Sequence, residues 1–88
     1  MAARASRALV DECVALHLAS RLSAADASMA KCWATDRLGW VADTCLQLHG
    51  GYGYMTEAPI ARLFTDARVA RIYGGSNEVL KELVARAL

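Results

Sequence analysis

A helical pattern runs from Ala24 to His49 with no proline to interrupt it. Apolar and small side chains recur along it at steps of three and four, which places them on one helix face: Ala27, Ala30, Ala34, Leu38, Val41, Cys45 and Leu48. A helix of this length extends about 39 Å at 1.5 Å per residue. The other helical segments are shorter, so we predict that this helix packs against more than the chain itself provides.

Capping residues mark the ends of the expected helices. Ser23 suits the N-cap of the long helix, and Gly50 suits its C-terminal end. A first helix is predicted over about residues 3–19, because Leu9, Cys13 and Leu16 recur there at helical spacing. Pro59 fits the first turn of a third helix, and Ser76 suits the N-cap of a fourth. No strand-like alternation exceeds three residues, so we predict an all-α chain folded as an antiparallel helical bundle.

The composition indicates that this bundle is not self-sufficient. The chain has 88 residues, is 56% hydrophobic and has a mean hydropathy of +0.22. A domain this small buries only about 60–65% of the surface of its unfolded chain. Surplus apolar surface normally marks a contact with a partner, so we expect further domains or subunits to cover it.

The charges exclude several classes of partner. The formal net charge is +1, with both signs distributed throughout and no basic stripe. Binding to nucleic acid is therefore not expected. No apolar run reaches the roughly 18 residues that a membrane-spanning helix needs.

The cysteines and the first residues bear on the compartment. Cys13, Cys32 and Cys45 are widely spaced and odd in number, which argues against a disulfide framework and a zinc site; we interpret them as reduced core thiols. The basic, acid-free start at residues 1–7 is similar to a transit peptide, but it merges into a helical pattern. We therefore expect a cytoplasmic protein, with the mitochondrial matrix as the alternative.

Two glycine-rich connections, Gly50-Gly51-Tyr52-Gly53 and Gly74-Gly75-Ser76, lead from one helical segment toward the next. Glycine lets the backbone turn sharply and lets a ligand approach closely. A helix that opens after such a turn points free N–H groups and a partial positive charge outward, which suits a phosphate or a polarised carbonyl oxygen. We predict that these connections belong to a binding surface.

These motifs occur in a fixed order that resembles the C-terminal helical domain of the acyl-CoA dehydrogenases. The matching residues are Ala30-Lys31, Gln47-Leu48-His49-Gly50-Gly51-Tyr52-Gly53-Tyr54-Met55, Pro59-Ile60-Ala61-Arg62-Leu63, Asp66-Ala67-Arg68 and Ile72-Tyr73-Gly74-Gly75-Ser76-Asn77-Glu78. The resemblance covers nearly the whole chain. It implies that residues 1–88 form this domain, incomplete at its N-terminal side.

The resemblance implies an FAD-dependent oxidoreductase. Members of the family carry an N-terminal helical domain and a β-domain before the helical bundle. They oxidise the Cα–Cβ bond of an acyl-CoA thioester, pass a hydride to FAD and deliver electrons to an electron-transfer flavoprotein. The chain is then a fragment or subunit that supplies FAD contacts and the interface of a homodimer or homotetramer, and is not expected to be active alone.

The resemblance also implies roles for individual residues. One segment is similar to the stretch that reaches the FAD of a neighbouring subunit: Gln47, Leu48, His49, Gly50 and Gly51. Ser76, Asn77 and Glu78 match the second FAD-contacting segment, where we expect Glu78 to meet hydroxyl or amide groups because its carboxylate repels phosphate. Helix capping alone is the alternative for both segments.

Gly74 departs from the family pattern. Many members carry the catalytic glutamate at this position, directly before the glycine matched by Gly75, and Gly74 offers no proton acceptor. Branches resembling the long-chain and isovaleryl enzymes bring the base from an earlier helix. Gly74 and Gly75 are therefore expected to bind substrate, with the Gly74 N–H polarising the thioester carbonyl. No catalytic side chain and no metal ligand are assigned in this chain.

A non-enzymatic function is the alternative. The same module could serve as a helical assembly or regulatory domain that no longer binds flavin. Binding of FAD in the presence of the missing domains separates the two.

Overall fold

The computed structural model describes residues 1–88 as helices and connecting turns, with no strand. The elements are α1 (Ala2–Leu18), α2 (Ala24–His49), the 3₁₀ helix η1 (Gly50–Tyr54), α3 (Pro59–Val69) and α4 (Asn77–Ala87). The all-α prediction is therefore confirmed.

The helices begin and end where the capping residues predict. The Oγ of Ser23 accepts a hydrogen bond from the N–H of Asp26 at 3.0 Å, and the Oγ of Ser76 accepts one from the N–H of Val79 at 3.4 Å. Pro59 occupies the first turn of α3. Gly50 ends α2 with φ 65°, a left-handed conformation that glycine adopts without steric cost.

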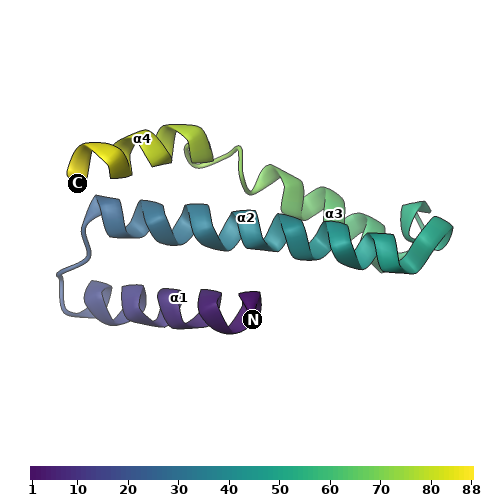
Figure 1. Cartoon of the computed structure of the whole chain (residues 1–88), viewed down its shortest axis with the longest axis horizontal. Coiled ribbons are helices and arrows are strands. Elements are labelled where there is room, and N and C mark those ends of the chain that lie inside the picture. Colours follow the sequence, from purple (N-terminus) through teal and green to yellow (C-terminus); the bar gives the residue numbers. More distant parts are fainter.

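α2 is the axis on which every other helix packs (Figure 1). α1 and α4 flank its N-terminal half, and α3 lies along its C-terminal half. All three run antiparallel to α2. α1 does not contact α4, and α3 does not contact α4. The result is an open antiparallel bundle in which α2 is covered along strips and never enclosed.

The surface of the molecule reflects this open packing. The radius of gyration is 15.1 Å, whereas a compact chain of this length has about 12 Å. The accessible surface is 6526 Å², whereas a folded monomer of this mass exposes about 5,000 Å². The excess of roughly 1,500 Å² is about twice the roughly 800 Å² that one partner contributes to a standard protein–protein interface.

The apolar face predicted on α2 is only partly covered within this chain, as expected for a helix that packs against more than the chain provides. The buried residues of α2 are Ser28, Cys32 and Ala42, whereas Leu38 is 47% exposed and Leu48 is 82% exposed. Small side chains face α3 and α4 because they allow close approach of the helices. Leu38 and Val41 border an open apolar groove of about 420 Å³ between α2 and α3. Periodicity identified the apolar stripe but not which helix covers it.

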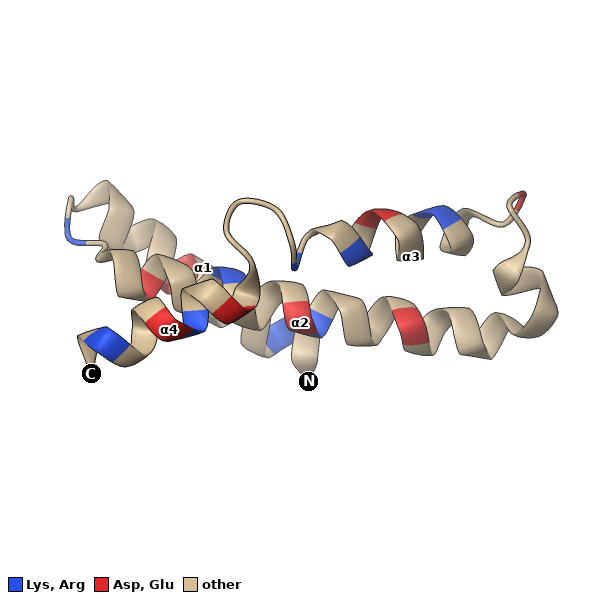
Figure 2. Ribbon diagram, turned by 90° about the horizontal axis from the view of Figure 1, so that it is seen from above, with Lys and Arg blue, Asp and Glu red and all other residues tan.

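Charges of both signs are interspersed along the helices (Figure 2). None of the helices combines the length and the apolar character that crossing a bilayer requires.

Candidate functional site

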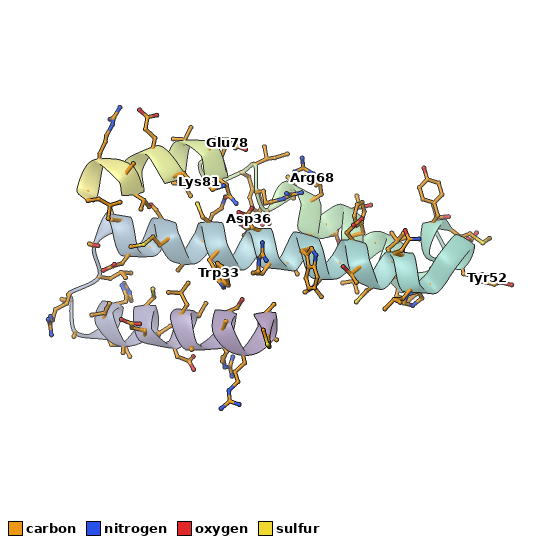
Figure 3. All side chains as sticks on the ribbon, viewed as in Figure 1. Trp33, Asp36, Tyr52, Arg68, Glu78 and Lys81 are labelled. Carbon is orange, nitrogen blue, oxygen red and sulfur yellow. The ribbon has the colours of Figure 1, made fainter.

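The two glycine-rich connections lie at different positions along α2. Gly50 and Gly51 follow its last residue, beside the exposed ring of Tyr52 (Figure 3). Gly75 lies against the N-terminal half of α2, where Lys31 reaches its carbonyl oxygen. At 1.5 Å per residue, this places the two connections roughly 25 Å apart. The chain therefore does not bring its two predicted cofactor-binding segments into one site.

The segment from Gln47 to Gly51 is exposed over its whole length. A ring nitrogen of His49, Nδ1, lies 2.7 Å from the carbonyl oxygen of Cys45, within the last turn of α2. A Cβ at Gly51 would have no neighbour within 4 Å, whereas one at Gly53 would lie 2.6 Å from a main-chain oxygen. Gly53 is thus required by packing, and the segment before it is free to contact another molecule.

Ser76, Asn77 and Glu78 line an open groove of about 600 Å³ between α2, α3 and α4. Glu78 and Lys81 on α4, Asp36 on α2 and Arg68 on α3 gather around it (Figure 3). Charged side chains dominate its wall: Asp36, Arg37, Asp43, Arg68, Arg71, Glu78 and Lys81. Four cations against three carboxylates make the groove slightly positive, and both signs are available to a ligand.

Two arginines of this groove have an unsatisfied donor. The Nε atoms of Arg37 and Arg71 are buried and have no hydrogen-bond partner. The guanidinium of Arg37 lies 5.1 Å from the centre of the Trp33 ring, within cation–π range. Buried N–H groups normally have acceptors, so these two positions are imperfectly paired within the chain, and both guanidinium groups line the groove. Neither residue belongs to a sequence motif, so both were missed; only the packing of the segment after α3 against α2 brings Arg71 close to Arg37.

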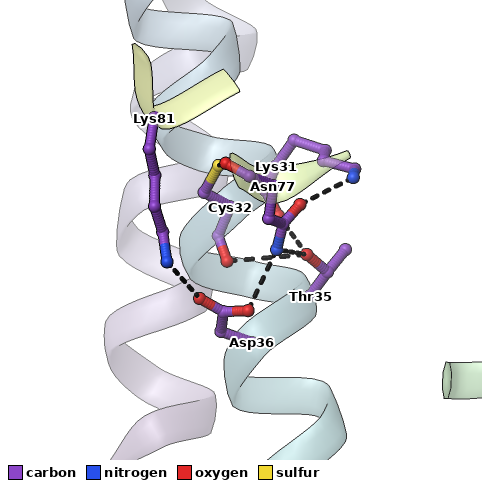
Figure 4. Close-up of polar contacts among 6 residues, drawn as sticks. All are labelled: Lys31, Cys32, Thr35, Asp36, Asn77 and Lys81. Carbon is purple, nitrogen blue, oxygen red and sulfur yellow. Dashed lines mark hydrogen bonds and ion pairs between the residues drawn. The ribbon is translucent and has the colours of Figure 1, made fainter. Parts of the chain in front are cut away.

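Asn77 is the most deeply buried polar residue of the chain, with 2% of its surface exposed. Its Oδ1 accepts from Lys31 Nζ at 2.7 Å, and its Nδ2 donates to Thr35 Oγ1 and to Asp36 Oδ1, both at 2.9 Å (Figure 4). Lys81 Nζ lies 3.7 Å from the second oxygen of Asp36. The side chain of Asn77 therefore anchors the start of α4 to α2, and its contact with a cofactor stays a prediction.

The backbone before α4 presents free donors. Gly74 and Gly75 are exposed and have φ of 66° and 89°. The N–H groups of Gly74, Gly75, Ser76 and Glu78 have no hydrogen-bond partner within the chain. Consecutive free amides at a helix start can donate to a phosphate or to a thioester carbonyl. A Cβ at Gly74 would meet nothing within 4 Å, so a larger side chain has room there, at the cost of a left-handed backbone conformation.

The remaining reactive side chains are dispersed. No group of three or more His, Cys, Asp or Glu side chains lies close enough to hold a metal ion. The three cysteines are free thiols. Cys32 is buried, and its thiol donates to the carbonyl oxygen of Asn77 at 3.6 Å. It adds a further contact between α2 and α4.

Comparisons with known proteins cover the whole chain. Residues 1–88 match the family described as acyl-CoA dehydrogenase, C-terminal domain. A mitochondrial long-chain specific acyl-CoA dehydrogenase of Rattus norvegicus is 57% identical over 83 residues, which are 94% of this chain and 19% of that protein.

Two solved structures have the same fold. An acyl-CoA dehydrogenase of Geobacillus kaustophilus superimposes with a TM-score of 0.92 at 43% identity, over 96% of this chain and 22% of that one. Butyryl-CoA dehydrogenase of Megasphaera elsdenii gives a TM-score of 0.93 at 36% identity, over 99% of this chain and 23% of that one. The chain thus spans about a fifth of the length of these relatives.

Proposed function

The chain belongs to the acyl-CoA dehydrogenase family, and we propose that it works as the C-terminal module of an FAD-dependent enzyme that oxidises the Cα–Cβ bond of an acyl-CoA thioester. Residues 1–88 match the C-terminal domain of that family over their full length. In this proposal the chain supplies flavin contacts, substrate contacts and an oligomer interface, whereas the N-terminal and β-domains supply the rest.

The groove residues fit a dinucleotide such as FAD. The free amides of Gly75, Ser76 and Glu78 suit phosphate or carbonyl oxygens. The positive charges of Arg37 and Arg71 line the same groove and suit an anionic group. When bound, FAD would supply the acceptor for the hydride that leaves the substrate. Glu78 would accept hydrogen bonds from hydroxyl or amide groups, because phosphate repels its carboxylate.

The separation of the two predicted flavin-binding segments supports an oligomer. Gln47, Leu48, His49, Gly50 and Gly51 lie roughly 25 Å from Gly75 along α2, so one flavin in a pocket of this chain does not serve both. We infer that the segment ending at Gly51 contacts the flavin of a neighbouring subunit in a homodimer or homotetramer. The excess exposed surface is large enough for such an interface.

Gly74 has a binding role without acid–base chemistry. Its exposed N–H has no partner within the chain, and it can donate to the thioester carbonyl oxygen and stabilise the negative charge that develops there. Removal of one such donor typically costs about 2.7–4 kcal/mol of transition-state stabilisation. The base that takes the α-proton would lie outside these residues, and electrons would leave to an electron-transfer flavoprotein. The cytoplasm is the proposed compartment, with the mitochondrial matrix as the alternative.

The observation that carries this proposal is the row of free amides beside the groove at the start of α4. To test it, the chain is mixed with FAD and with the N-terminal and β-domains of a related dehydrogenase. We expect a yellow complex whose flavin absorbance bleaches on addition of an acyl-CoA. Colourless helical oligomers that ignore the added domains would instead support a non-catalytic assembly module and contradict the proposal.

A second experiment tests the position of Gly74. In the assembled protein with its own base removed, Gly74→Glu should restore part of the dehydrogenation, because the side chain has open space. The matched control, Gly51→Glu, places a carboxylate in equally open space at the other connection and should restore nothing. Unchanged inactivity of Gly74→Glu with flavin still bound would count against the assigned position.

A further inference from the structure

Lys31 links α2 to a connection 44 residues further along the chain. Its Nζ donates to the carbonyl oxygen of Gly75 at 3.0 Å and to the Oδ1 of Asn77 at 2.7 Å (Figure 4). We propose that Lys31 is a positioning residue that sets the direction of the amide groups before α4. The inference rests on the proposed function, in which these amides face the flavin-linked thioester.

The geometry of one peptide group connects Lys31 with the amide of Ser76. The carbonyl of Gly75 and the N–H of Ser76 belong to the same peptide group, and the chain has no cis peptide bond. In a planar trans peptide, the C=O and the N–H point in opposite directions. Because the Lys31 ammonium group fixes the direction of the Gly75 carbonyl, it also fixes the direction of the Ser76 N–H, which points away from that ammonium group and has no partner within the chain.

This carbonyl has no other support. The bond from Lys31 is the only hydrogen bond made by any main-chain group of Gly74 or Gly75. Both residues have positive φ, at 66° and 89°, and glycine is the residue with the widest choice of backbone conformations. Without the ammonium group, the peptide group between Gly75 and Ser76 can rotate and turn its N–H away from the ligand.

A role through general stability is the competing explanation, because Lys31 also contacts Asn77. Thr35→Val provides a matched control. Thr35 accepts from the Nδ2 of Asn77 at 2.9 Å, so its loss weakens the same anchor but leaves the contact between Lys31 and Gly75 intact. A structural role predicts similar effects of Lys31→Met and Thr35→Val, whereas a positioning role predicts an effect on the Ser76 amide from Lys31→Met alone.

Backbone ¹⁵N relaxation of the 88-residue chain provides a measurement that needs no flavin. We expect the Ser76 amide to have an order parameter of about 0.85 in the unaltered chain and in Thr35→Val, and below about 0.6 in Lys31→Met. Lys31→Arg should restore order, since its guanidinium can reach and donate. If Lys31→Met loses its helical circular dichroism, Lys31→Gln replaces it, because that side chain is too short to reach Gly75. An equally ordered Ser76 amide without Lys31 would overturn the proposal.

Flavin titration of the chain assembled with the domains of a related dehydrogenase is the second measurement. Lys31→Met should weaken FAD binding about tenfold, because the Ser76 amide loses one hydrogen bond to a charged group of the ligand, worth about 1.4 kcal/mol. Thr35→Val should weaken FAD binding less than twofold. Equal losses in both variants would assign Lys31 a structural role only. If the unaltered chain takes up no FAD, the proposed function fails, while the relaxation measurement still decides the role of Lys31.

Discussion

The anchor formed by Asn77 yields a quantitative prediction for Asn77→Ala. The substitution removes three side-chain hydrogen bonds: one from Lys31, one to Asp36 and one to Thr35. A hydrogen bond to a charged group contributes about 1.5–3 kcal/mol and a neutral one about 1 kcal/mol. The lower values total about 4 kcal/mol. The three partners are half-exposed, so water replaces part of the lost hydrogen bonding in the variant. We therefore expect the free energy of unfolding to fall by about 3 kcal/mol.

The assay is urea unfolding of the 88-residue chain, followed by circular dichroism at 222 nm. A compact domain of this length has a free energy of unfolding of roughly 4–13 kcal/mol, and an open bundle lies at the low end of that range. A loss of about 3 kcal/mol should therefore lower the urea midpoint steeply. Ser76→Ala is the matched control from the adjacent position. It removes a single cap bond of 3.4 Å and should cost about 0.5–1 kcal/mol. A cost for Asn77→Ala below 1 kcal/mol, or equal to that of Ser76→Ala, would refute the anchor.

Three further substitutions are tested by the same unfolding assay. Gly53→Ala should destabilise the chain by more than about 2 kcal/mol, because its Cβ would lie 2.6 Å from a main-chain oxygen, whereas Gly51→Ala meets nothing within 4 Å; equal effects would contradict this packing. Gly74→Ala should lower the free energy of unfolding by only the roughly 1–2 kcal/mol of a left-handed residue. Gly75→Ala should lower it further, because the Cβ at Gly75 would also lie 3.2 Å from a leucine methyl group; the reverse order would be inconsistent with the loop geometry. Ser23→Ala should cost about 1 kcal/mol through loss of the α2 cap, and an unchanged midpoint would show that the cap contributes nothing.

Local signals along the chain account for the part of the fold that was predicted correctly. Ser23 and Ser76 cap α2 and α4, Pro59 opens α3 and Gly50 closes α2, as residue type predicts. These signals act within one helical turn, so neighbouring residues decide them. The exposed glycine connections are likewise local features.

The face of each helix that becomes buried was not predictable in the same way. The helical repeat placed Leu38 and Leu48 on the apolar face of the long helix, and both are exposed within this chain. Burial depends on where α1, α3 and α4 lie around α2, and periodicity alone does not encode that arrangement. On α4, the apolar side chains of Val79 and Leu83 are likewise 59% and 38% exposed.

The sequence by itself determined the helices, their ends and the family, because capping, helix propensity and ordered motifs are properties of short stretches. Only the tertiary structure decided that Asn77 is an anchor, that Lys31 holds the Gly75 carbonyl and that Arg37 and Arg71 share a groove. These contacts join residues more than 30 positions apart. Their geometry exists only after α3 and α4 have packed against α2, which fixes the directions of side chains and peptide groups that no local pattern specifies.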